Sequence, residues 1–186
     1  YIYSALFTTQ SIKQAQRYYR YFLEIINDQE YDNKYLKRIR KIVPDYPKIA
    51  ITYSVGENQD GADANQSEMK NSLKIYNAMY HTDFSMDELR AYNTNVSERL
   101  ARKKEQYKPR DQQLDMVIVV DRMLTGFDAP SLSALYLDRP PLPYKNLIQA
   151  FSRTNRIFDQ DKKFLIFRWR NKRSNGTQVG YFKGII

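Results

Sequence analysis

Two arginines and a glutamine in the segment 147–156, LIQAFSRTNR, have the types and spacing to bind a phosphate. Gln149, Arg153 and Arg156 stand at positions i, i+4 and i+7, so on a helix they share one face. An arginine guanidinium is a rigid fork of donors that matches a phosphate with two hydrogen bonds. The same spacing is also typical of an amphipathic helix with a solvated basic face. Spacing alone does not decide between these two interpretations.

A second segment, DRMLTGFDAP at 121–130, directly follows the apolar run 114–120, LDMVIVV. A nearly continuous apolar run of this length is typical of a parallel strand buried on both faces. In open α/β sheets, ligands bind outside the carboxyl ends of the strands, so this loop is where a site is expected. Gly126 permits close backbone approach, Thr125 offers a hydroxyl, and Asp128 offers a carboxylate for a ribose or an arginine.

Taken together, TGFDAP and QAFSRTNR resemble motifs V and VI of superfamily 2 helicases, in the version found in R subunits of type I restriction endonucleases. The phrase VIVVDRMLTGFDAPSLSALYLDRP is close to that family's wording, and the loop ITYSVGENQDGADAN is also familiar from it. The resemblance extends over roughly residues 1–167 and is most specific around the two motifs. It implies an ATP-dependent DNA-translocating subunit of a site-specific deoxyribonuclease, in a bacterial cytoplasm.

The resemblance also implies roles for individual residues in an ATP site that lies between two RecA-like domains. Arg153 and Arg156 would face the phosphates, with Arg156 as the arginine finger, and Gln149 would contact the phosphates or the attacking water. Asp128 would meet the ribose or orient the arginines, beside Gly126. The catalytic residues expected are therefore Gln149, Arg153 and Arg156, and the ATP contacts expected are these three with Gly126 and Asp128.

Two parts of such a site are missing from the sequence. A phosphate loop needs Gly-Lys followed by Ser or Thr, but none of the six glycines is followed by lysine. No DExx-like sequence follows a strand candidate either. We therefore expect the cofactors of the full-length subunit to be ATP and Mg²⁺, with the metal held by the first RecA-like domain. This chain is expected to hold no metal itself and to be inactive alone. It opens within a predicted strand, which is expected of a fragment.

The expected macromolecular partner is double-stranded DNA. The net charge is +9, and Lys and Arg that neutralise phosphates gain affinity by releasing counterions. Basic residues cluster at 34–41, 99–110 and 162–173, although each cluster is also what a solvated surface looks like. In superfamily 2 motors the second domain grips strand phosphates at strand ends, for which the matching residues are Thr8, Thr9, Thr52 and Thr125. The family further implies modification and specificity subunits as partners, and no apolar run is long enough for a membrane span.

The elements that must position these residues alternate between strand and helix. Strands are predicted at 1–8, 48–54, 114–120, 132–137 and 164–167. Helices are predicted from Ser11 to about 26, at 67–80, from Ser85, at 95–107 and at 143–157, with residues 27–47 polar and without an element. The fold class predicted is α/β, a RecA-like parallel sheet flanked by helices. One domain, 1–168, is followed by a divergent basic tail, 169–186, for which no order is predicted.

Other functions have weaker support. Asp45, Glu68 and Lys70 superficially resemble a metal-nuclease pattern, but Glu68 and Lys70 fall at a predicted helix start rather than on a strand. His81 is the only histidine and cannot form a multi-histidine metal site, and cysteine is absent. The remaining alternatives are the second motor domain of another superfamily 2 DNA helicase and a non-catalytic basic DNA-binding module.

Overall fold

The computed structural model describes residues 3–28, 33–54, 62–120, 129–138, 165–174 and 177–185. For residues 165–174 and 177–185 only the course of the backbone is described. The predicted helix at 143–157 and the predicted loop at 121–128 lie outside the described residues.

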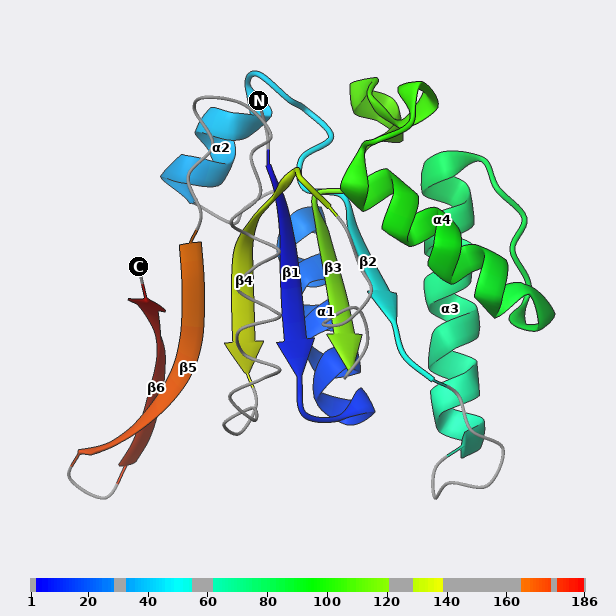
Figure 1. Ribbon diagram of the computed structural model, residues 1–186. Coiled ribbons are helices and arrows are strands. Elements are labelled where there is room, and N and C mark those ends of the chain that lie inside the picture. The colour runs from blue at the N-terminus through cyan, green and yellow to red at the C-terminus, as the bar shows by residue number, and fades with distance from the viewer. Residues whose placement is uncertain are drawn as a thin grey trace.

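The sheet is the centre of the molecule (Figure 1). Its strands are β1 (Ser4–Thr9), β2 (Ile49–Thr52), β3 (Met116–Val120), β4 (Leu132–Asp138), β5 (Leu165–Ser174) and β6 (Thr177–Ile185). Their spatial order is β2-β3-β1-β4-β5-β6. The first five run parallel, and β6 returns antiparallel to β5. The predicted α/β class with a parallel sheet flanked by helices is confirmed, and this arrangement is compatible with a RecA-like fold.

Helices cover both faces of this sheet. They are α1 (Ile12–Asn27), α2 (Lys34–Arg40), α3 (Ala62–Tyr80) and α4 (Leu89–Ala101). Helix α1 packs behind the strands in Figure 1, where Phe7 of β1 meets the rings of Tyr18 and Phe22. Side chains alternate between the two faces of a strand. Thr52 of β2 therefore points to the opposite face, where its hydroxyl contacts Asn93 of α4.

The core sits between the sheet and these helices. The middle of β3, Val117–Val119, is fully buried, as the apolar run predicted, and β1 and β2 are buried along almost their whole lengths. Burying one such aliphatic side chain contributes about 1.5–3 kcal/mol. Helix α1 begins as the sequence predicts, because the Ser11 side chain accepts the Gln14 backbone N–H at 3.3 Å.

The bounds of the helix predicted at 95–107 are wrong. Helix α4 starts at Leu89 and ends at Ala101, because Arg102 adopts a left-handed conformation with φ of 55°. Two short 3₁₀ turns follow, at Glu105–Tyr107 and Arg110–Gln112. Two basic residues of the predicted helix are buried, since Arg99 and Arg102 are 4% and 5% exposed.

Two further elements were not predicted. The polar stretch 27–47 contains α2, capped by Asn33, whose side chain accepts the backbone N–H groups of Tyr35 and Leu36. The strand predicted at 164–167 is the start of β5, which continues to Ser174 and pairs with β6. The residues of the predicted basic tail, 169–186, therefore include the larger part of a β-hairpin.

Candidate functional site

The carboxyl ends of the parallel strands form one edge of the sheet, at the arrowheads of β1 to β4 in Figure 1. At this edge Thr8 of β1 and Thr52 of β2 are both in register with Val119 of β3. The two threonines therefore lie in one row and point to the same face, the face that α4 covers. The next row contains Val120, Thr9 and Asp138, and it points toward α1.

The structure places three of the four predicted DNA contacts at this edge. Thr8, Thr9 and Thr52 are all buried, with at most 1% of each exposed. The Thr9 hydroxyl donates to the Ser11 carbonyl at 3.1 Å, and the Thr52 hydroxyl donates to the Asn93 side chain. The Thr8 hydroxyl has no hydrogen-bond partner among the described residues. In this conformation all three hydroxyls are covered, so a phosphate can contact them only if the residues that cover them move away.

The predicted ATP site lies outside the described residues. This applies to Gly126, Asp128, Gln149, Arg153 and Arg156, and to the fourth predicted DNA contact, Thr125. The structure does describe the residues on both sides of 121–128: β3 ends at Val120 on the carboxyl edge, and Ala129 is fully buried before β4. The roles of these residues stay predictions.

Two polar contacts at the carboxyl edge were not predicted. The Tyr18 hydroxyl donates to the Asp138 carboxylate at 2.6 Å, which ties α1 to the end of β4. Burial and the hydrogen bond to this carboxylate both raise the pKa of Tyr18. On the other side, Gln16 donates to the Tyr53 hydroxyl at 3.0 Å, and that hydroxyl donates to the Asn65 carbonyl at 3.0 Å. These contacts connect α1, the end of β2 and the start of α3.

The amino edge of the sheet carries a buried ionic cluster around Asp115. This carboxylate, 3% exposed, accepts two hydrogen bonds from Arg110, at 2.5 and 2.8 Å, and one from the Lys48 backbone N–H at 2.8 Å. Arg102 lies 3.6 Å from it and donates to the Leu114 carbonyl at 3.0 Å. Burial lowers the pKa of Arg102 to about 10, against the attraction of Asp115. The cluster fixes the start of β3, at the end opposite the predicted site.

Arg99 is buried beside this cluster by aromatic rings. Its guanidinium carbon lies 3.9 Å from the ring centre of Tyr80 and 5.1 Å from that of Tyr107. It also donates to the side chain of Gln112 at 2.7 Å. The sequence held one signal for this burial: Arg99 follows Tyr92 and Val96 at helical spacing on the inner face of α4. Of the six basic residues at 99–110, three are therefore held in structural contacts and three are exposed: Arg99, Arg102 and Arg110 belong to the first group, and Lys103, Lys104 and Lys108 to the second.

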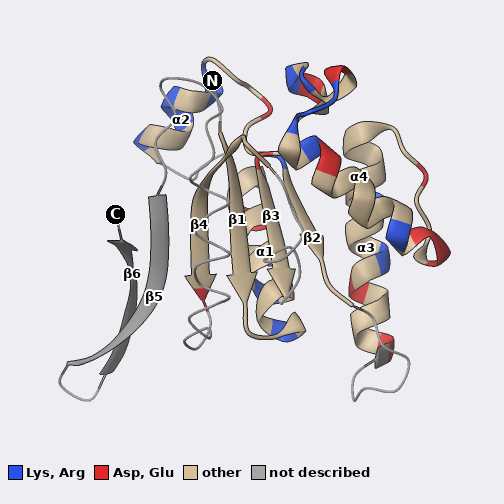
Figure 2. Cartoon of the chain, viewed as in Figure 1, with Lys and Arg blue, Asp and Glu red and all other residues tan. Residues whose placement is uncertain are grey.

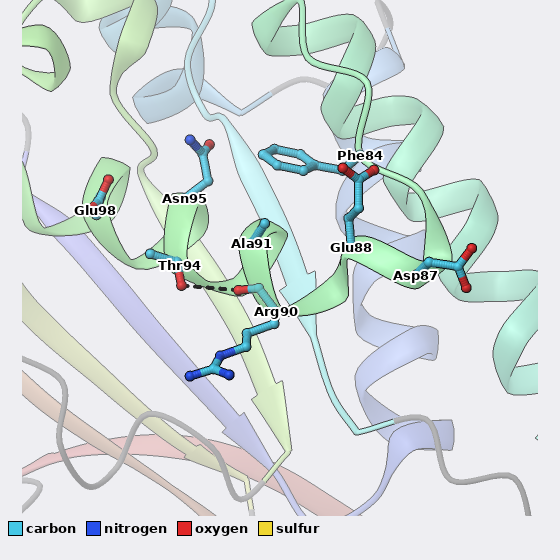
Figure 3. A pocket seen from close by; sticks show the side chains of 8 residues that line it. All are labelled: Phe84, Asp87, Glu88, Arg90, Ala91, Thr94, Asn95 and Glu98. Atoms are coloured by element: carbon cyan, nitrogen blue, oxygen red, sulfur yellow. Dashed lines mark hydrogen bonds between the residues drawn. The ribbon is translucent and has the colours of Figure 1, made fainter.

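A shallow hollow of about 680 Å³ lies on the outer face of α4 (Figure 3). It is lined by Phe84, Asp87, Glu88, Arg90, Ala91, Thr94, Asn95 and Glu98. None of the residues predicted for the ATP or DNA sites lines it. Its carboxylates come from one helix and its preceding turn, and the Thr94 hydroxyl is engaged with the Arg90 carbonyl at 3.0 Å. We assign it no catalytic role.

The described residues contain no group of three or more His, Cys, Asp and Glu side chains arranged to hold a metal ion. The helices described also include none that is both long and apolar enough to cross a bilayer.

Comparison with known proteins gives a consistent result. A family model described as type I restriction enzyme subunit R domain 3 matches residues 1–171. A type I restriction enzyme endonuclease subunit of Staphylococcus aureus (strain COL) is 32% identical over 167 residues, which is 87% of this chain and 16% of the relative. The corresponding subunit of Staphylococcus saprophyticus is 32% identical over 174 residues, 93% of this chain and 17% of the relative. The HindI endonuclease subunit of Haemophilus influenzae is 48% identical over 52 residues, 28% of this chain and 5% of the relative. The chain thus spans about a sixth of the length of the first two relatives.

Proposed function

Because this chain belongs to the family of type I restriction enzyme R subunits, as their domain 3, we propose that it acts as the second RecA-like domain of an ATP-driven DNA motor. In this proposal the chain completes an ATP site whose other half lies on the first RecA-like domain of the same subunit. The single observation that carries the proposal is the family match over residues 1–171, which contains both TGFDAP and QAFSRTNR.

The architecture supports this proposal. The segment 121–128, with Gly126 and Asp128, begins directly after Val120 at the carboxyl end of β3. Strand β3 is internal, between β2 and β1, and buried on both faces. A loop that leaves such a strand emerges at the edge where α/β proteins bind ligands.

The chemistry proposed is charge neutralisation. In phosphoryl transfer, negative charge on the transferring group must be stabilised in the transition state, and an arginine supplied from a neighbouring domain contributes roughly 10³–10⁵ in rate. Arg156 is the proposed finger, Arg153 holds the phosphates, and Gln149 contacts the phosphates or the attacking water. Since the finger reaches the phosphate only when the two domains close, the same residue couples hydrolysis to movement.

The proposal leaves Mg²⁺ to the other domain. In the proposal this chain's part is to bind, orient and neutralise the phosphates. Double-stranded DNA and the modification and specificity subunits are the proposed partners of the whole subunit. The proposed strand-end contacts to DNA remain Thr8, Thr9, Thr52 and Thr125. Contacts to phosphates do not depend on the base sequence, and a translocating motor requires this independence.

The test is ATP hydrolysis by the complete subunit carrying Arg156→Ala. We expect hydrolysis to fall at least a thousandfold, with translocation lost and DNA binding retained. The matched control is Arg90→Ala, which removes an exposed arginine of α4 and should leave hydrolysis unchanged. Normal hydrolysis by the Arg156 variant would contradict the proposal. If hydrolysis is absent in the unmodified subunit too, and DNA binding depends only on salt, the chain is a non-catalytic basic DNA-binding module.

A further inference from the structure

Helix α2 carries an exposed stripe of cations on a short, rigidly held element. Lys34, Lys37, Arg38 and Lys41 stand at positions i, i+3, i+4 and i+7, so they share one face, and all four are exposed. No acidic residue occurs within α2, and Figure 2 shows it as a helix marked only by basic residues. We call these four residues the α2 stripe.

An apolar row runs beside the α2 stripe. Tyr35 and Ile42 stand seven residues apart, one position around the helix from the cations, and they are 65% and 80% exposed. Both side chains are more exposed than the other large hydrophobic side chains on the surface of the described residues. The Lys34 ammonium lies 5.1 Å from the ring centre of Tyr35. A basic stripe with an aromatic margin is suited to the phosphates and sugars of a nucleic acid backbone.

The framework around α2 is fixed, so the stripe is presented in one orientation. Arg40, on the inner side of the helix, donates to the Tyr46 carbonyl at 2.8 Å and to the Ile26 carbonyl at 3.0 Å. These bonds tie α2 to the end of α1 and to the segment that leads into β2. Arg40 is thus a structural arginine, whereas the α2 stripe lies on the exposed side of the helix.

Local structure accounts for only part of the stripe. Lys37 and Arg38 lie in the last turn of α2, where the helix dipole favours cations, but the close spacing of the four like charges works against the helix. Like charges three and four residues apart on a helix repel each other. Lys34 also lies in the first turn, where the helix dipole disfavours a cation. A seven-residue helix has little stability of its own to offset these costs. A cation placed against local stability, as Lys34 is, is expected where a function needs it.

The geometry points to the α2 stripe as a second contact to the phosphate backbone of duplex DNA, separate from the predicted carboxyl-edge site. This inference rests on the proposed function and adds a surface to it. Figure 1 shows α2 near the amino ends of the strands, opposite the carboxyl edge. The stripe is about 10 Å long from Lys34 to Lys41 at 1.5 Å per residue, which spans about three phosphates of one strand. Such a contact is independent of sequence.

The experiment measures binding of the full-length protein to a labelled duplex of about 30 base pairs at several salt concentrations. The test variant is Lys34→Gln with Arg38→Gln, two stripe cations at i and i+4. The matched control is Lys70→Gln with Lys74→Gln, two exposed lysines of α3 at the same spacing. Both variants lose two charges, so any effect of net charge alone is equal in the two.

We expect the slope of log K against log salt to fall by about 1.8 in the stripe variant, since each lost phosphate contact removes about 0.9. Affinity at 0.1 M salt should drop on the order of 10- to 100-fold, while the control changes neither quantity. Far-UV circular dichroism should be the same for all three proteins.

Equal slopes in the stripe variant and the control would overturn the inference and leave the proposed motor function standing. Loss of association with partner subunits, with DNA binding intact, would also overturn it, by identifying an acidic protein as the partner. Failure of the unmodified protein to bind DNA at low salt would instead refute the proposed function itself.

Discussion

Removing the carboxylate of Asp115 is the most severe single change that the described structure predicts outside the hydrophobic core. Asp115→Ala leaves the Arg102 guanidinium, 5% exposed, without the carboxylate 3.6 Å away. It also removes both hydrogen bonds from Arg110 and the acceptor of the Lys48 backbone N–H. Removing one partner of a buried ion pair costs about 3–5 kcal/mol, because the remaining charge stays buried without compensation. A domain of this size is stable by about 5–15 kcal/mol, so the loss is a large fraction.

Urea unfolding followed by far-UV circular dichroism measures this loss. With a typical m-value of about 2 kcal/mol per molar, the unfolding midpoint of the Asp115 variant should fall by roughly 2 M. The control is Asp87→Ala, an exposed carboxylate at the hollow of α4, for which a change within about 0.5 kcal/mol is expected. A loss below about 1 kcal/mol for Asp115→Ala would refute the reasoning that the cluster is buried and mutually dependent.

A double-mutant cycle sharpens the same prediction. Arg102→Met alone removes a buried cation and leaves Asp115 with its bonds from Arg110. Made in the Asp115→Ala background, it also removes the uncompensated charge, so it should be less destabilising there, or stabilising. Additive effects of the two substitutions would show that Arg102 and Asp115 do not interact.

Three further changes test other parts of the fold. Tyr18→Phe removes the hydroxyl that donates to the buried Asp138 carboxylate, and the free energy of unfolding in urea should fall by about 1–2 kcal/mol. An unchanged free energy of unfolding would show that this contact does not stabilise the fold. Hydrogen bonds and attraction from cationic neighbours outweigh burial and lower the pKa of Asp45, so its contribution is present at neutral pH and lost as pH falls below about 4. Asp45→Asn should therefore weaken the acid dependence of stability between about pH 5 and 3, and an unaltered pH profile would contradict this. Leu100→Ala removes a fully buried side chain and should cost about 2–5 kcal/mol, whereas a loss under 1 kcal/mol would mean that the site is not packed.

The sequence was most informative where a local signal decides the structure. The apolar run at 114–120 predicted a fully buried strand, and Ser11 predicted the start of α1, because both signals are local. Sequence patterns could not predict that Arg102 ends α4 in a left-handed conformation. Nor could they predict that Asp115, thirteen positions later, compensates the buried Arg102 guanidinium. A residue type that is usually exposed becomes buried here through a contact distant in the sequence.

The candidate site divides in the same way. Register in the sheet brings Thr8 and Thr52 into one row at the carboxyl edge, as their places at predicted strand ends indicated. Their burial and the engagement of Thr52 with Asn93 could not be predicted, because the sequence indicated two helices, one from Ser85 and one at 95–107, where the structure has α4. The α2 stripe was visible as a basic cluster, but its single face and its anchoring by Arg40 required the structure.

The measurement that tests the central claim most directly is a structure of the complete subunit bound to duplex DNA and a non-hydrolysable ATP analogue. The proposal predicts that the Arg156 guanidinium lies within hydrogen-bond reach, about 2.7–2.9 Å, of the terminal phosphate, with Arg153 on the same nucleotide. It also predicts that the nucleotide lies at the carboxyl edge of β3. A nucleotide bound elsewhere, with both arginines facing solvent, would contradict the account.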